Sequence, residues 1–369
     1  MTTDLQRATH ARYWVIVFAV TLAIIQYIDR VCISKAMPLI QRDLHFSNVQ
    51  AGYIFGAFTL AYALFEIPTG WLGDRFGPRK VLLRVVIWWS FFTAATAQAG
   101  TAISMMIVRF LFGAGEAGCF PNITKAFSTW LPRDERVRAQ SILWLAARWG
   151  GAATPLLVVG VLGLVSSWRR AFELFGALGL VWAFFFYRWF RDNPHEHPSV
   201  NDAEKKLLTG VENLASRHAK VPWAVFFSSY SAWLLWIQYA CLSYVWYFYV
   251  TWFPTYLDAT HGRTLGPVKL AVLAGLPLFG GGFGSLIAGF CTAPLARRAG
   301  GVGRARRLLA AFGFVAASGL LLASAYAVNP FVLALLIALA GMCNDFVLPC
   351  AWARAWTSEG DSRAPSLAA

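Results

Sequence analysis

The chain has 369 residues, of which 58% are hydrophobic, 16% are aromatic and only 14% are charged. Soluble domains carry roughly 25% charged residues, so this composition excludes an ordinary soluble enzyme or binding domain. The net charge of +14 does not indicate nucleic-acid binding either, because Lys and Arg collect in short segments between apolar runs.

Apolar runs recur along the whole chain, and about ten of them reach the roughly 20 residues that a helix needs to cross a bilayer. Six precede a polar stretch and four follow it. We therefore predict an all-α integral membrane protein with a six-helix N-terminal bundle (1–190), a cytoplasmic central loop (191–225) and an incomplete four-helix C-terminal bundle (226–369). In chain order, the expected helices cover 13–34, 49–72, 79–98, 102–125, 139–163, 168–190, 228–257, 266–293, 305–327 and 329–356.

The charges between these runs predict the orientation in the membrane. Cytoplasmic loops carry an excess of Lys and Arg, and here basic connections alternate with connections such as 97–102 and 327–330 that carry no charge. The segment 168–170 is a local exception. Both termini are therefore predicted to be cytoplasmic, in a multi-pass protein of the cell (inner) membrane. The basic residues on the cytoplasmic side are Arg7, Arg12, Arg75, Arg79, Lys80, Arg133, Arg136, Arg138, Arg297, Arg298, Arg304, Arg306 and Arg307.

Ionisable residues inside the expected helices are candidates for function, because an unpaired charge at the bilayer centre costs about 3 kcal/mol or more. Arg109 and Glu116 are seven residues apart, so they project from one helix face with about 10 Å between them. The adjacent residues Asp29 and Arg30 point to different partners. This spacing favours crossed pairs between the first and fourth helices. Pairing that only locks the bundle is the alternative. Glu66, Arg148 and Asp345 are further charges of this kind.

These residue types are suited to carrying an anion together with a proton. An Arg is always charged and can hold a carboxylate through two hydrogen bonds. A buried carboxylate such as Glu116 can take up and release a proton near neutral pH. The segment 228–257 adds polar and aromatic groups that either line a cavity or pack in the core: Gln238, Tyr239, Tyr244, Tyr247, Tyr249 and Trp252.

No catalytic or metal-binding pattern emerges from the sequence. The six His residues all lie in predicted loops. The run Gly280-Gly281-Gly282 is followed by no Lys-Ser or Lys-Thr pair, so it favours close helix packing and not a phosphate loop. We expect a protein that is not an enzyme and uses no cofactor or metal.

The segment from Gly70 to Lys80 resembles the loop after the second helix of the major facilitator superfamily. A degraded second copy follows the eighth expected helix, at 289–301. The resemblance implies two bundles that arose by repetition, and a cytoplasmic gate that involves Gly70, Asp74, Arg75, Gly77, Arg79 and Lys80.

Further segments resemble the anion:cation symporter family within that superfamily. They are Tyr27-Ile-Asp29-Arg30, the stretch from Arg109 to Ala117 with Phe120-Pro121-Asn122, the stretch from Trp168 to Phe172, and Arg191-Asp-Asn-Pro194 leading to Glu204. Carried over by position, the resemblance implies substrate contacts at Arg30, Tyr62, Gln238 and Arg148. It also implies proton coupling through Asp29 and Glu116, with Arg109 as the partner of these charges.

We therefore expect a symporter that imports a small organic anion (a sugar acid or other carboxylate) with protons by alternating access. Its partners are then the substrate, protons and the lipid bilayer, with no nucleic acid, and the chain is expected to be a monomer. The family has twelve helices, whereas the polar sequence from Arg354 onward departs from its pattern, so we expect a C-terminal truncation. The alternatives are a transport-inactive fragment, a membrane sensor, and an exporter or facilitator of neutral solutes.

Overall fold

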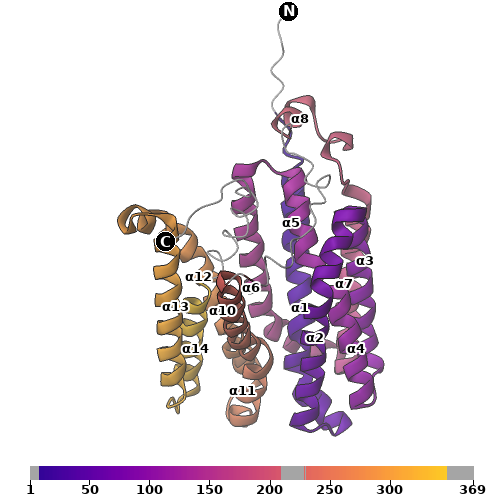
Figure 1. Cartoon of the computed structure of the whole chain (residues 1–369). Coiled ribbons are helices and arrows are strands. Elements are labelled where there is room, and N and C mark those ends of the chain that lie inside the picture. The colour runs from indigo at the N-terminus through magenta and orange to yellow at the C-terminus, as the bar shows by residue number, and fades with distance from the viewer. Residues whose placement is uncertain (1–7, 209–227, 229, 347–369) are drawn as a thin grey trace, which may run out of the picture.

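The computed structural model describes residues 8–208, 228 and 230–346, and its regular structure there is entirely helical (Figure 1). Within these residues, eight helices are long and apolar enough to cross a membrane. The prediction of an all-α integral membrane protein is therefore confirmed. The N-terminal half contains α1 (Tyr13–Leu44), α2 (Asn48–Phe76), α3 (Pro78–Ala95), η1 (Thr96–Gln98), α4 (Ala102–Glu116), α5 (Cys119–Trp130), α6 (Arg133–Val165) and α7 (Trp168–Trp189).

The second half is shorter. Two short elements, η2 (Pro194–Glu196) and α8 (Asp202–Leu208), lie in the connecting segment. They are followed by α10 (Tyr230–Tyr247), η4 (Phe248–Trp252), α11 (Phe253–His261), α12 (Pro267–Ala299), α13 (Val302–Ser324) and α14 (Pro330–Asn344). Part of the expected central loop, 209–227, and the tail from 347 to 369 lie outside the described residues. The predicted truncation therefore stays a prediction.

Several helices differ from the sequence-based expectation in their boundaries. The expected span 102–125 is divided at Ala117–Gly118 into α4 and α5, and it continues to Trp130. The expected span 228–257 continues to His261 and contains the π-helical turn η4. Pro254 explains the break, because proline has no N–H and its ring clashes with the carbonyl four residues earlier, which here lies inside η4. The helix expected over 329–356 is described only as far as Asn344.

Glycines allow the two bundles to approach each other closely where α6 packs on α12. A Cβ atom added at Gly275 of α12 would lie 2.2 Å from the carbonyl oxygen of Ala152 in α6. One added at Gly280 would lie 2.4 Å from the carbonyl oxygen of Ala338 in α14. The prediction that the run of three glycines permits close helix packing is confirmed. This contact places α6 at the boundary between the halves.

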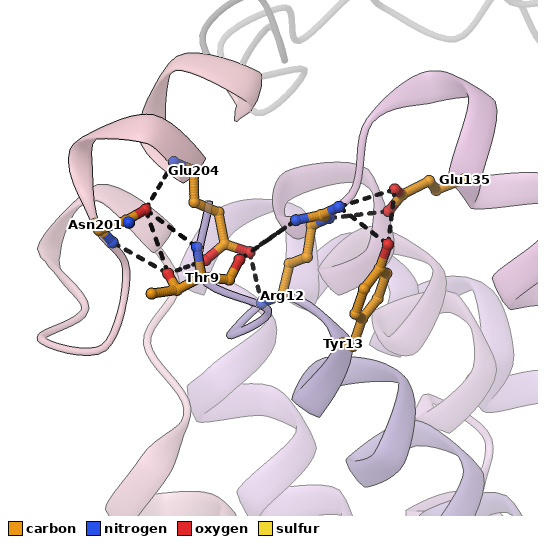
Figure 2. Close-up of polar contacts among 6 residues, drawn as sticks. All are labelled: Thr9, Arg12, Tyr13, Glu135, Asn201 and Glu204. Carbon is orange, nitrogen blue, oxygen red and sulfur yellow. Dashed lines mark hydrogen bonds and ion pairs between the residues drawn. The ribbon is translucent and has the colours of Figure 1, made fainter. Parts of the chain in front are cut away.

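A buried polar cluster attaches the connecting segment to the N-terminal bundle (Figure 2). The Glu204 side chain of α8 has no solvent exposure, and it accepts a hydrogen bond from Arg12 Nη1 at 3.0 Å. Arg12 also donates through Nε to Glu135 Oε2, at 3.1 Å. These hydrogen bonds from Arg12 hold the pKa of Glu135 below its usual range. Thr9 and Asn201 complete the cluster. It forms at the end of the molecule where α8 lies, opposite α11 (Figure 1).

Candidate functional site

A buried charged cluster lies where α1 meets α4. Arg30 Nε donates to Glu116 Oε1 at 2.9 Å, and Arg30 Nη2 contacts the same oxygen. Gln26 Nε2 donates to this oxygen as well, at 2.8 Å. Glu116 is completely buried and Arg30 is 9% exposed. Of the crossed pairs predicted between the first and fourth membrane helices, the structure therefore shows the one between Arg30 and Glu116.

The other two members of this cluster make no ion pair within 4 Å to the described residues. Asp29 is fully buried, and neither of its carboxylate oxygens has a hydrogen-bond partner in the described part of the chain. Arg109 is also buried, and its guanidinium lies 4.0 Å from the ring centroid of Phe112. Asp29 lies within electrostatic range of Arg109 and Glu116. Among the described residues, the cluster thus contains a buried acid and a buried cation that form no ion pair.

Arg30 and Arg109 both line a small pocket that is partly open. The pocket wall combines residues of α1, α2 and α4 with residues of α10 and η4, so both halves of the chain contribute to it. The site therefore holds two cations beside several hydroxyl groups, an arrangement that suits an oxygen-rich anion. Its polar side chains are Arg30, Ser34, Thr59, Arg109, Tyr247 and Thr251, and its apolar side chains are Ile33, Ile54, Phe55, Phe58 and Val250.

Sequence reasoning missed Ser34, Thr59 and Thr251 as pocket residues. A signal was available for Ser34, because a residue four positions after Arg30 lies on the same helix face. Tyr247 was one of several aromatic residues in its segment that could line a cavity, and the structure selects it. Thr251 reaches the pocket from the π-helical turn, which the sequence pattern does not reveal.

Aromatic rings surround the guanidinium of Arg30. Its carbon Cζ lies 4.8 Å from the ring centroid of Tyr62, 5.3 Å from that of Phe58 and 5.6 Å from that of Trp246. A cation over an aromatic face is stabilised by about 1 kcal/mol or more when water is excluded. Tyr62 therefore contacts the predicted substrate-binding Arg30, although it does not line the pocket itself.

Two other predicted substrate contacts lie away from the pocket. Arg148 pairs with Asp345, with 2.7 Å between Nε and Oδ2 and 2.9 Å between Nη2 and Oδ1. Gln238 lies nine residues before Tyr247 on α10, about 13 Å along the helix axis, and is half-buried. Neither Arg148 nor Gln238 is a lining residue of this pocket.

The residues of the predicted gate lie at the end of α2 and the start of α3, and they contact other parts of the N-terminal half. Asp74 pairs with Lys125 Nζ at 2.7 Å, and Gly77 ends α2 with a positive φ of 82°. The Arg79 backbone N–H donates to Asp192 Oδ1 at 2.8 Å. Burial raises the pKa of Asp192. The guanidinium of Arg75 lies over the rings of Trp71 and Phe76. Gly70 packs near Pro121. Lys80 is exposed.

Comparison with known proteins decides which family this architecture represents. The family model of the Major Facilitator Superfamily matches residues 19–358. The chain belongs to this superfamily. It is a family of membrane transporters and not of enzymes, as predicted from the sequence.

Several relatives are named as transporters of acids, which confirms the resemblance to the anion:cation symporters. A probable sulfoacetate transporter of Cupriavidus necator is 37% identical over 285 residues, which cover 76% of this chain and 65% of the relative. A probable galactarate/D-glucarate transporter of Escherichia coli K12 is 30% identical over 361 residues, which cover 92% of this chain and 80% of the relative. The chain thus spans less than two thirds of the length of the first of these relatives.

A solved structure of the same fold agrees with this assignment. A bacterial homologue of the human lysosomal transporter Spinster, in an inward-facing and unoccupied conformation, superimposes with a TM-score of 0.70. The match covers 93% of this chain and 75% of that structure, at 20% sequence identity. The predicted major facilitator fold is therefore confirmed.

Proposed function

We propose that this chain is a secondary transporter that imports a small organic anion together with protons. The single observation that carries the proposal is the pocket between the two halves, which has buried Arg30 and Arg109 in its wall. Transporters of this architecture bind substrate near the middle of the membrane and alternate access by rocking one bundle against the other. The acids named for the relatives support an anionic substrate.

The charges of the cluster explain how anion and proton can stabilise each other. With Asp29 and Glu116 ionised, their charges balance those of Arg30 and Arg109. Protonating the two acids leaves two uncompensated positive charges beside the pocket. An anionic substrate neutralises these charges, and the attraction is strong because the site has a low dielectric constant. Proton binding thus favours anion binding, and release of either favours release of the other.

Each residue of the cluster then has a defined role. When Glu116 is protonated, it releases the guanidinium of Arg30. Arg30 then binds the substrate carboxylate. Arg109 supplies the second cation, and Asp29, whose oxygens have no hydrogen-bond partner among the described residues, takes the other proton. Tyr62 orients Arg30, and Gln238 and Arg148 act outside this pocket.

The orientation follows from the loop charges, with both termini in the cytoplasm of a cell whose inner membrane holds the protein. Arg42 of α1 and Asp258 of α11 then form their 3.7 Å ion pair on the outer side. The buried arginines argue against a neutral solute, because two desolvated cations have no partner in such a substrate.

Uptake of labelled acids into cells that make this chain tests the proposal. The panel contains sulfoacetate, D-glucarate, a hexuronate, an aromatic acid and a neutral hexose, each with and without a protonophore and in sodium-free medium. We expect one or more acids, and not the hexose, to accumulate without sodium and to lose accumulation with the protonophore. Accumulation that needs sodium would contradict proton coupling, and uptake of the hexose alone would contradict anion selectivity. Cells that lack the chain serve as the control.

A further inference from the structure

A buried charge pair away from the pocket joins the two halves of the molecule. Arg148 belongs to α6, and Asp345 follows α14 directly. Their side chains are each only 4% exposed, and two nitrogen–oxygen contacts of 2.7 and 2.9 Å connect them. Both charges are desolvated, so each depends on the other for compensation. The pair therefore ties the N-terminal bundle to the C-terminal helices.

The Arg148–Asp345 pair lies at about the same level across the membrane as the pocket. Arg148 is fifteen residues after the start of α6 at Arg133 and seventeen before its end at Val165, so it occupies the middle of the helix. The buried Trp246 of α10 faces both arginines: its ring centroid is 5.5 Å from Cζ of Arg148 and 5.6 Å from Cζ of Arg30. Trp246 thus lies between the inter-bundle pair and the substrate-binding cluster, next to Tyr27, whose ring centroid is 5.4 Å from Cζ of Arg30.

The neighbouring helix is shaped to receive this carboxylate. A Cβ atom at Gly281 of α12 would lie 2.6 Å from Asp345 Oδ2, closer than a side chain allows. The glycine run therefore does more than bring helices together, because it leaves room for a charged group in the interface.

A second inter-bundle ion pair lies at one end of the molecule and is built differently. Arg42 and Asp258 are 3.7 Å apart, and the Arg42 side chain is 75% exposed. Arg42 is twelve residues beyond Arg30 on α1, which places it roughly 18 Å along the helix axis. When two rigid bundles rock, the displacement of a contact grows with its distance from the axis of rotation. The end pair must separate, whereas a pair near the axis can stay closed.

We propose that Arg148 and Asp345 form the pivot of the transport cycle, a positioning pair that stays closed while the bundles rock about it. Arg148 is then not a substrate ligand. The pair fixes the position of the pocket residues of one bundle relative to those of the other bundle. Trp246, which contacts both arginines, thereby holds Arg30 in place. This inference rests on the proposed function, because it requires alternating access.

Two cross-links distinguish a pivot from a gate. One joins cysteines at Trp149→Cys and Phe279→Cys, whose native rings stack across the interface at 5.5 Å beside Arg148. The other joins Arg42→Cys and Asp258→Cys. Both are made with a flexible thiol-reactive linker after Cys241, Cys291 and Cys350 are replaced by Ser. The readout is the initial uptake rate of D-glucarate or sulfoacetate, whichever the wild-type chain accumulates.

We expect the link beside Arg148 to leave at least about a third of the uptake rate, and the end link to reduce uptake at least about tenfold. Equal loss with both links would overturn the pivot and leave the proposed function standing. Full uptake with both, or no uptake of any acid by the wild-type chain, would overturn alternating access and the pivot with it.

Neutralising the pair gives a second, independent test. The double variant Arg148→Gln with Asp345→Asn removes both charges together, so no buried charge is left unpaired. We expect this variant to bind the labelled acid with a Kd within about threefold of wild type, while its uptake rate falls at least about tenfold. Wild-type uptake by the double variant would show that the pair is not needed for transport.

Discussion

Glu116→Gln is expected to abolish proton-driven accumulation of the transported acid while substrate exchange continues. Oε1 of Glu116 accepts hydrogen bonds from Arg30 and Gln26, and a glutamine oxygen can still accept them. Glutamine cannot bind or release a proton, so substrate binding is no longer coupled to the proton gradient. Uptake driven by an imposed pH gradient should fall at least about tenfold, whereas counterflow exchange should stay within about threefold of wild type.

The same substitution at an exposed acid serves as the control. Glu173 of α7 is exposed, and its helix contributes no residue to the pocket. Cells that make the Glu173→Gln variant should therefore accumulate the acid as wild type does. Accumulation by the Glu116→Gln variant at the wild-type level would contradict the coupling role of Glu116.

The second large effect is expected at Arg109. Its guanidinium lines the pocket, is buried and makes no ion pair within 4 Å to the described residues, so it is available to an anionic group of the substrate. A hydrogen bond to a charged group contributes about 1.5–3 kcal/mol. Arg109→Gln should therefore raise KM for the transported acid roughly 10- to 100-fold, with Arg109→Lys intermediate. Concentration-dependent initial rates measure this change.

Arg109 is a better test of anion binding than Arg30. Removing Arg30 would leave the buried Glu116 without its cation, which destabilises the fold by about 3–5 kcal/mol. The exposed Arg188 of α7 provides the matched control, and Arg188→Gln should leave KM unchanged. An Arg109→Gln variant with the KM of wild type would show that the substrate does not bind this guanidinium.

The membrane fold could be predicted from the sequence because lipid imposes a simple rule. Each long apolar run must form a helix, since an unpaired backbone group in the bilayer costs several kcal/mol. The pairing of Arg30 with Glu116 was predictable for a similar reason, because few partners exist for a charge in the membrane. Local spacing and the scarcity of intramembrane charges carried this part of the prediction.

The rest of the site depends on contacts that no local pattern contains. Arg148 meets Asp345, a residue 197 positions later, only because α6 packs on α12 and α14. Thr251 enters the pocket through a π-helical turn, which shifts the helix face by one residue after Tyr247. The complete burial of Glu204 likewise depends on Arg12, which reaches it from the other end of the N-terminal half. Each of these positions required the three-dimensional packing of segments that are remote in sequence.

If anion and proton cross the membrane together, adding a transported acid must move protons, and this movement can be measured in vesicles. The purified chain is reconstituted into proteoliposomes that contain a pH-sensitive dye, and D-glucarate or sulfoacetate is added outside at equal pH. We expect the lumen to acidify when a transported acid is added, and we expect no such signal from the Glu116→Gln variant. Accumulation of the labelled acid without any change in lumen pH would contradict joint transport of anion and proton.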